Sequence, residues 1–353
     1  MTAGVPSHSG TMRILAVTNM YPTPGNVALG TFVEQQVMGL RAAGVEMDVL
    51  FIDRRRHGSS AYLTVPSQIR RRLRRFDADL VHVMYGGVMS ALAVRAVRDR
   101  PTIVTFHGSD LLGEHLSGWW RRLIAFGGVL CSRYTAHRAT GVVVVAPLLS
   151  QALPDNVDPG KVRVIPCGID LSRFRPLDRH ACRQALGWQD DRFHVLFNSN
   201  GDDPVKRPGL ARAAVERLRA AGIEAELQEL RGMPNSEMPR RLNAGDVLLL
   251  TSRHEGSPTV VKEALACNVP VVSVDVGDVR QQIQGVDGCY LAEADAEDLA
   301  AKLRAVHEGP RRVDGRVKME ALSLEQIALR LREFYCDALS PDDSMGAGSG
   351  PPR

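Results

Sequence analysis

The sequence predicts an α/β protein made of two doubly wound domains in tandem, each built on a parallel β-sheet. Short apolar runs rich in β-branched residues alternate with longer amphipathic stretches through the first half of the chain. The same alternation begins again after residues 161–177, which are rich in turn-forming residues. Gly, Pro, Asn and Asp bound the runs. This pattern is typical of strands that alternate with helices and are covered on both faces.

In the first half, a helix is expected over residues 31–44, ending at Gly44, and five apolar runs are expected to be strands. These strands are residues 12–18, 46–53, 79–85, 101–107 and 141–146. Because successive strands of this kind need a covering connection, the stretches between them are expected to be helical.

In the second half, a helix is expected around residues 208–221. The expected strands are residues 194–200, 224–230, 246–252 and 269–275. The domains are placed at residues 12–170 and 171–322, with crevices facing each other at the carboxyl ends of both sheets. A final helix over 323–338 has apolar residues spaced along one side and is expected to pack back toward the first domain. Residues 1–11 and 339–353 are expected to be flexible tails.

Composition narrows the class of protein. Apolar residues make up 44% and charged residues 24% of the chain, which is ordinary for a globular protein. No apolar run approaches the roughly 20 residues of a membrane span, and the N-terminus does not resemble a secretory signal. The six cysteines have no CxxC spacing, so reduced thiols in a cytoplasmic protein are expected rather than disulfides or a zinc site.

Positive charge is concentrated in the first half. Residues 1–170 carry 19 Lys and Arg against 12 Asp and Glu, whereas the remainder carries 25 against 28. The excess includes Arg54–Arg56 and the stretch RRRLRRF at residues 70–76. Such a surface suits an anionic partner, although a solvated helix face explains it equally well. No nucleic-acid motif accompanies it, so nucleic-acid binding is not expected.

The stretch RHEGSPTVVKEALACNVP places two carboxylates around the start of a helix. Glu255 lies in the loop that follows an expected strand, and Ser257 and Pro258 are suited to the N-cap and first position of a helix ending at Asn268. The free amides near this N-terminus form an anion site. Glu263 lies further along the helix, about 8 Å from its start. A ligand with a phosphate and hydroxyl-bearing rings fits this arrangement; a capped helix with two surface glutamates is the alternative.

The same stretch, EGSPTVVKEALACNVPVVSVDVGDV (residues 255–279), resembles the EX7E motif of retaining GT-B glycosyltransferases. It is most similar to the large nucleotide-sugar family, glycosyltransferase family 4, and within it to the bacterial branch of teichuronic acid and exopolysaccharide biosynthesis. The resemblance covers about residues 12–338. It implies a GT-B fold, and a retaining transfer from a nucleotide-diphosphate sugar, expected to be a UDP-sugar, without a metal or other cofactor.

The resemblance also implies roles for residues of the second domain. Glu263 corresponds to the glutamate that binds the ribose hydroxyls, and Glu255 to the one that contacts the transferred sugar. The segment of Ser257, Pro258, Thr259 and Val260 corresponds to the one whose amides meet the sugar or the diphosphate. Lys206 corresponds to the lysine that meets the leaving group. The arginine usual a few residues earlier is absent; Arg207 either replaces it or faces solvent.

The nucleobase is expected over the loop that contains Arg231 and Met233. In the first domain, His107 corresponds to the histidine that reaches the transferred sugar, and Asp110 either orients it or binds the acceptor. Gly30 and Thr31 resemble the family's glycine segment and are expected near the donor. Asn19 and Tyr21 lie in the first loop and are expected near the acceptor. A plain turn before a helix is the alternative for this segment.

The expected acceptor is a glycan, a polyprenyl-linked glycan or a small glycoside. The stretch WWRRLIAF (119–126) mixes aromatic and basic residues, so peripheral contact with an anionic membrane at the inner face of the cell membrane is one interpretation; a core helix with solvated arginines is the other. Two other functions were considered. An inactive GT-B scaffold that binds a nucleotide sugar or a protein partner is the alternative. A nicotinamide-dependent oxidoreductase is disfavoured because no GxGxxG follows the strands.

Overall fold

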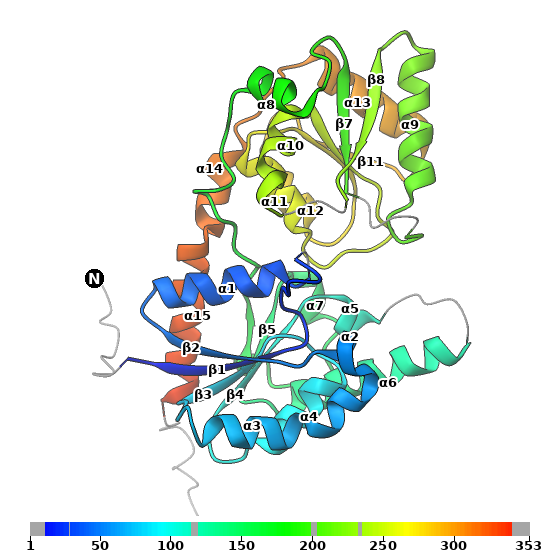
Figure 1. The fold of residues 1–353 in the computed structure, drawn as a ribbon. Coiled ribbons are helices and arrows are strands. Elements are labelled where there is room, and N and C mark those ends of the chain that lie inside the picture. The colour runs from blue at the N-terminus through cyan, green and yellow to red at the C-terminus, as the bar shows by residue number, and fades with distance from the viewer. Residues whose placement is uncertain (1–10, 28, 114–118, 199–202, 232–234, 341–353) are drawn as a thin grey trace, which may run out of the picture.

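The computed structural model describes residues 11–27, 29–113, 119–198, 203–231 and 235–340, and it arranges them around two sheets (Figure 1). Each sheet pairs all of its strands in parallel, as predicted. Most of the tail residues and Met233 lie outside the described residues.

The first sheet has six strands in the order β2-β1-β3-β4-β5-β6. They are β1 (Arg13–Thr18), β2 (Glu46–Phe51), β3 (Leu80–Val83), β4 (Thr102–Phe106), β5 (Gly141–Val144) and β6 (Val162–Val164). The helices of this domain are α1 (Thr31–Ala42), α2 (Arg54–His57), α3 (Val65–Leu73), α4 (Val88–Ala96), α5 (Ser109–Leu112), α6 (Trp119–Arg138) and α7 (Pro147–Ser150).

The second sheet has five strands in the order β11-β10-β9-β7-β8. They are β7 (Phe193–Phe197), β8 (Ala225–Glu229), β9 (Val247–Leu250), β10 (Val271–Val274) and β11 (Tyr290–Ala292). The remaining helices are α8 (Arg179–Leu186), α9 (Pro208–Ala220), α10 (Met238–Ala244), α11 (Thr259–Ala266), α12 (Val279–Ile283), α13 (Ala296–Glu308), α14 (Gly315–Met319) and α15 (Leu324–Leu339). Short 3-10 turns lie at Gly58–Thr64, Pro159–Lys161, Asn235–Glu237 and Glu320–Leu322.

Two short edge strands, β6 and β11, were not predicted. Both span three residues and are only partly buried, so they lack the apolar run that marks the longer strands. β6 lies inside the stretch that was interpreted as turns, and it extends the first sheet by pairing with β5. Edge pairing of this kind is decided by the neighbouring strand rather than by the local sequence.

The first sheet is buried on both faces, and β1 shows how its sequence does this. Ile14 and Ala16 belong to the core on one face, whereas Leu15 and Val17 belong to the core on the other. This alternation is the two-residue period of a strand. α1 and α15 pack together on the first of these faces (Figure 1).

α15 returns to the first domain after the chain has completed the second. Ile327, Leu331 and Phe334, spaced to share one helix face, are buried in the core with Ile14. The hydroxyl of Tyr335 lies 2.6 Å from His82 Nδ1, and His82 Nε2 lies 2.7 Å from Thr105 Oγ1. Burial lowers the pKa of His82 to about 3, so the ring is neutral and the helix is held by uncharged hydrogen bonds.

The two crossings between the domains lie side by side. The amide of Ile169 donates to the carbonyl of Leu322, and the amide of Leu324 donates to the carbonyl of Ile169. The guanidinium of Arg316 donates to the carbonyls of Leu171 and Phe174. The outgoing and returning segments are therefore tied to each other and to the second domain.

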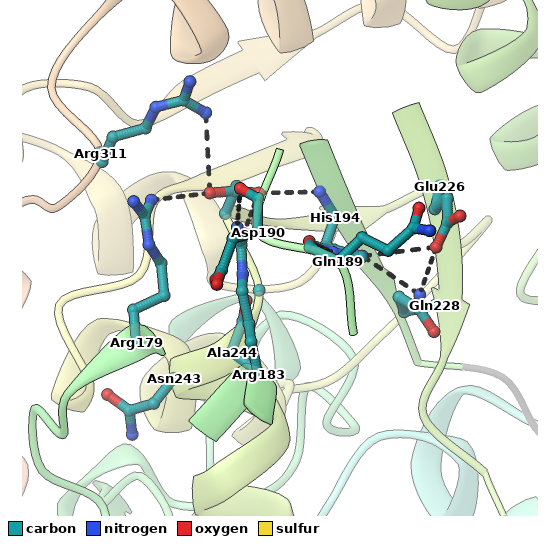
Figure 2. Close-up of polar contacts among 12 residues, drawn as sticks. Arg179, Arg183, Gln189, Asp190, His194, Glu226, Gln228, Asn243, Ala244 and Arg311 are labelled. Atoms are coloured by element: carbon teal, nitrogen blue, oxygen red, sulfur yellow. Dashed lines mark hydrogen bonds and ion pairs between the residues drawn. The ribbon is translucent and has the colours of Figure 1, made fainter. Parts of the chain in front are cut away.

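The second domain contains a buried ionic network at the amino-terminal edge of its sheet (Figure 2). Asp246, just before β9, accepts hydrogen bonds from Arg183 Nη2 at 2.6 Å and from Arg179 Nη1 at 3.0 Å. Its carboxylate also accepts from the amide of His194, and Arg311 lies 3.6 Å from it. Because this edge is opposite the carboxyl ends of the strands, the network supports the fold rather than the crevice.

Candidate functional site

A pocket of about 190 Å³ lies where the carboxyl ends of the two sheets meet. Its lining from the first domain and the crossing segment is Phe32, His107, Val145 and Cys167. Its lining from the second domain is Asn198, Lys206, Glu255, Ser257, Pro258, Thr259 and Val260. Seven of the residues predicted from the sequence are thus brought together from segments far apart in the chain.

Lys206 and Glu255 form an ion pair in this pocket. Lys206 Nζ donates to Glu255 Oε1 at 2.5 Å, and Ser252 Oγ donates to the same oxygen at 2.7 Å. Thr251 Oγ1 donates to the carbonyl of Lys206 at 2.7 Å, so the loop after β9 holds the loop after β7. When a ligand binds, the lysine can exchange the carboxylate for an anionic group of the ligand. The carboxylate can then accept a hydrogen bond from a ligand hydroxyl.

The helix predicted from Pro258 begins one residue later and is capped differently. α11 starts at Thr259, and no side chain caps it. Ser257, expected to be the N-cap, instead donates its hydroxyl to Asp278 Oδ2 at 2.7 Å. Within the described chain, no carbonyl accepts from the amides of Thr259 and Val260. They therefore remain available to an anion in the pocket, as predicted.

Glu263 lies one helical turn beyond Thr259 on the same side of α11, but it is not part of the pocket lining. Its side chain is buried, and it makes no hydrogen bond to another described residue. Burial raises the pKa of its carboxyl to about 7, against the opposing effect of Arg173 and Lys262. A buried carboxylate without a hydrogen-bond partner is energetically costly, which favours its completion by a ligand.

His107 directly follows β4 and is held between aromatic rings. The centroid of its ring lies 4.5 Å from that of Phe32 and 5.8 Å from that of Tyr85. Nε2 is buried without a partner, and Nδ1 lies 3.7 Å from Cys167 Sγ. Burial lowers the pKa of His107 to about 3, with a further contribution from Lys262. The ring is neutral and presents a nitrogen that can bond to a ligand hydroxyl.

Asp110 holds the loop that carries His107. Its Oδ1 accepts from the amides of His107 and Gly108, both at 2.9 Å, and its Oδ2 accepts from the amide of Gly86 at 2.8 Å. The carboxylate is buried, and burial raises its pKa to about 6. Of the two roles expected for Asp110, this geometry fits orientation of His107, and acceptor binding stays a prediction.

Arg207 does not join Lys206 in the pocket. Its Nε donates to the carbonyl of Thr251 at 2.5 Å and its Nη2 to that of Ser252 at 3.1 Å. Its backbone is left-handed, with φ of 52°. Arg207 is half-buried and lines a neighbouring pocket of about 900 Å³, with Arg253 and Arg280, at the carboxyl ends of the second sheet. Donor binding by Arg207 stays a prediction.

The glycine segment places one aromatic residue in the pocket. Gly30 precedes α1 with φ of 64°, and a Cβ there would lie 2.2 Å from the carbonyl carbon of Met20. Gly30 and Thr31 are outside the pocket lining, but they position Phe32 within it. Asn19 Nδ2 donates to Tyr62 at 3.4 Å and its buried Oδ1 has no described partner.

Two residues predicted at the edges of the site lie away from this pocket. Tyr21 packs its ring 6.5 Å from that of Phe51, and burial raises its pKa. Arg231 is exposed, with Nε 3.5 Å from Glu229 Oε2. Met233, predicted beside it, is outside the described residues. Neither placement tests the proposed contacts to acceptor or nucleobase.

Sequence reasoning missed two residues around the pocket, Cys167 and Lys262; Phe32 belongs to the glycine segment that was expected near the donor. Lys262 is fully buried, and its Nζ donates to the carbonyl of Cys167 in the crossing segment at 3.0 Å. A lysine among the apolar residues TVVKEALA was the available indication, because an uncompensated buried ammonium is rare. Burial raises the pKa of the Cys167 thiol.

Glycines allow the two domains to approach each other closely at the cleft. A Cβ on Gly256 would lie 2.1 Å from the carbonyl oxygen of His107, and one on Gly108 would lie 3.1 Å from Gly256 Cα. The loop that carries Glu255 therefore touches the loop that carries His107. Among the described residues, no group of His, Cys, Asp and Glu could hold a metal ion.

Comparisons with known proteins agree with this geometry. Residues 29–173 match the model described as Glycosyltransferase Family 4, and residues 184–308 match Glycosyl transferases group 1. A sucrose-phosphate synthase from Thermosynechococcus elongatus has a TM-score of 0.76 at 18% identity, covering 92% of this chain and 98% of that one. Anabaena HepE in complex with UDP-glucose has a TM-score of 0.65 at 16% identity, covering 92% and 100%. The fold is GT-B.

Curated relatives correct one expectation from the sequence. A D-inositol 3-phosphate glycosyltransferase of Geodermatophilus obscurus is 33% identical over 186 residues, which cover 43% of this chain and 41% of that protein. The chain thus spans about two fifths of the length of that relative. Other relatives carry the same name. The expected closeness to the teichuronic acid and exopolysaccharide branch is not supported by these relatives.

Proposed function

We propose that this chain, whose two halves match glycosyltransferase models and which has the GT-B fold, is a retaining family 4 glycosyltransferase that uses a nucleotide-diphosphate sugar. The observation that carries the proposal is the cleft pocket, where Lys206, Glu255, His107 and the amides that begin α11 converge from two domains. UDP is the proposed nucleotide, because the similar HepE structure holds UDP-glucose.

Lys206 and the start of α11 are proposed to stabilise the diphosphate leaving group. Negative charge grows on the phosphate oxygen as the bond to the sugar breaks, so an ammonium and two free amides aimed at it lower the barrier. A bound diphosphate would replace Glu255 as the partner of Lys206. Glu255 would then be free to accept a hydrogen bond from a hydroxyl of the transferred sugar. This arrangement uses no metal ion.

Glu263 and His107 are proposed to position the two ends of the donor. The buried carboxylate of Glu263 is suited to accept hydrogen bonds from both ribose hydroxyls. The neutral ring of His107 offers Nε2 to a sugar hydroxyl. With the donor fixed in this way, the acceptor oxygen bonds to the anomeric carbon on the face from which the diphosphate departs. The acceptor proton passes to the departing phosphate oxygen, and the configuration is retained.

The acceptor is proposed to bind on the first-domain side of the cleft. The relatives named for D-inositol 3-phosphate make a phosphorylated polyol the first acceptor to test. A glycan or a lipid-linked glycan is the second class to test. An inactive scaffold that binds the donor without turnover is the alternative function, because the arginine usual a few residues before Lys206 is absent from the sequence.

The test is a donor screen that follows nucleotide-diphosphate release, with binding of each nucleotide measured by calorimetry in parallel. Lys206→Met is expected to lower kcat by about a hundredfold or more, because it removes a charge from the leaving group. Lys302→Met, on the surface helix α13, is the matched control and should not change it. Activity in the presence of EDTA tests metal independence, and product NMR tests retention.

If a donor binds but no donor and acceptor pair is turned over, the protein is the inactive scaffold instead. If the protein neither binds nor turns over any donor, the proposal is overturned altogether. Equal kcat for Lys206→Met and wild type would remove Lys206 from the mechanism.

A further inference from the structure

The helix α6 presents a stripe of exposed apolar side chains. Ile124 is 73% exposed and Phe126 is 59% exposed, and Leu123 and Leu130 are also exposed. Leu123, Phe126 and Leu130 are spaced by three and four residues, so they share one side of the helix. The interpretation of WWRRLIAF as a core helix is wrong for these residues, since a core helix would bury them.

An apolar groove of about 370 Å³ runs beside this stripe. Its walls are residues of α5, α6 and the segment after α7, with two arginines among them. The lining is Leu111, Leu112, Gly113, Arg122, Ala125, Phe126, Val129, Leu130, Arg133 and Ala152. Apolar side chains and two guanidinium groups of α6, those of Arg122 and Arg133, therefore line the same groove.

The charge on α6 is entirely positive. Its 20 residues contain four arginines and no aspartate or glutamate. At its carboxyl end a separate pocket, of about 520 Å³, is lined by Arg95, Arg98, Arg100 and Arg138, of which Arg100 is paired with Asp77 and Asp99. α4 packs against α6 and contributes to this basic end (Figure 1). The apolar stripe is thus flanked along the helix by cations.

We propose that α6 and the end of α5 dock the protein on an anionic phospholipid surface. Leu123, Ile124, Phe126 and Leu130 enter the boundary between headgroups and acyl chains, while arginines of α6 and the basic pocket contact lipid phosphates. The interleaved apolar and cationic side chains of α6, which has no acidic residue, match an anionic phospholipid surface in charge. No helix in the described chain is long and apolar enough to cross a membrane.

Docking through this surface has a consequence for the cleft. α5 begins two residues after His107 and its last residues line the groove. The first-domain side of the cleft would therefore lie close to the bilayer. The docking proposal rests on the surface of α6 alone and does not depend on the proposed transfer reaction.

Sedimentation with lipid vesicles tests the proposal. Vesicles of phosphatidylcholine alone are compared with vesicles of phosphatidylcholine and phosphatidylglycerol in equal parts. We expect binding to the mixed vesicles, weakened by salt, and little binding to the neutral ones. Leu123→Ser/Phe126→Ser should weaken binding to the mixed vesicles about tenfold or more, because two inserted apolar side chains are lost.

The matched control is Val317→Ser/Leu329→Ser, which removes two exposed apolar residues from α14 and α15. It should bind the mixed vesicles as the wild type does. Thermal unfolding checks that both double variants fold. Equal binding by the α6 variant and the wild type overturns the proposal. So does absence of wild-type binding to mixed vesicles, or a dimer in solution that the α6 variant abolishes while vesicle binding is unaffected.

Discussion

At the scale of one residue, the carboxyl of Glu263, which we propose binds the ribose, lowers the free energy of unfolding at neutral pH. Its carboxyl is buried on α11 with no hydrogen bond to a described residue, and burial raises its pKa from 4.5 to about 7. Between these pH values the unfolded chain is ionised at this position while the folded chain keeps the proton. The free energy of unfolding therefore falls as pH rises through this window, and it stays lower above it.

We expect Glu263→Gln to be more stable than the wild type above pH 7, by up to about 3 kcal/mol, because the amide has no charge to desolvate. Below the ordinary carboxyl pKa the difference should vanish. Urea unfolding across this pH range measures it, with Glu333→Gln on the exposed side of α15 as the control. A Glu263→Gln variant that is no more stable than the wild type above pH 7 would contradict the role of burial.

His107 and Asp110 take the arrangement that one of the two expected roles for Asp110 describes, in which Asp110 orients the loop of His107. Asp110 uses its carboxylate on three backbone amides, so it fixes the loop and leaves His107 as the group that faces the pocket. The sequence pattern TFHGSD could identify both residues but could not assign their directions. That assignment depends on Gly86, which lies 24 residues earlier and reaches Asp110 only in the folded sheet.

At the scale of elements, the loops after β7 and β9 act together. Thr251 and Glu255 of one loop hold Lys206 of the other, and Arg207 bonds to carbonyls of Thr251 and Ser252. The adjacent strands β7 and β9 make this possible, although their loops are some 50 positions apart in the sequence. The geometry of the ion pair is thus a property of strand order.

The Asp246 network stabilises the opposite edge of the same sheet (Figure 2). Arg183 and Asp246 are both fully buried, so removing one charge leaves the other without compensation. We expect Asp246→Asn to lower the free energy of unfolding by about 3 to 5 kcal/mol, as for other broken buried pairs. Urea unfolding at neutral pH is the measurement.

Arg217→Gln provides the comparison for Asp246→Asn. It breaks the ion pair of Arg217 with Glu297, in which both side chains are largely exposed. Its cost should be no more than about 1 kcal/mol, because water and salt screen an exposed pair. Similar costs for the two variants would show that the buried network is not a major source of stability.

At the scale of the whole molecule, function depends on how closely the two domains approach. The contact of Gly256 with the carbonyl of His107 leaves no space for a side chain. Lys262 adds a second link, since its buried ammonium bonds to the crossing segment at Cys167. These contacts set the distance between the groups that each domain supplies to the pocket.

We expect Gly256→Ala to separate the domains at the cleft and to lower kcat by about a hundredfold, because a small displacement of reacting groups is costly. X-ray scattering should show a more open molecule, and each domain should remain folded by circular dichroism. Gly209→Ala in α9 is the control, since a Cβ there meets no atom within 4 Å. Unchanged scattering and turnover for Gly256→Ala would contradict this account of the contact.

The sequence by itself determined the tandem α/β architecture and most of the strands, and it selected Lys206, Glu255, His107 and the start of α11 as candidate site residues, which line one pocket. Hydrophobic periodicity and turn residues determine local structure, so they can be recognised from the sequence alone. Tertiary structure alone decided which side chains face the pocket. It turned Asp110 and Arg207 toward backbone groups, brought Phe32, Cys167 and Lys262 to the site, and left the apolar side of α6 in solvent. These outcomes depend on strand order and on contacts between distant segments, which no local pattern records.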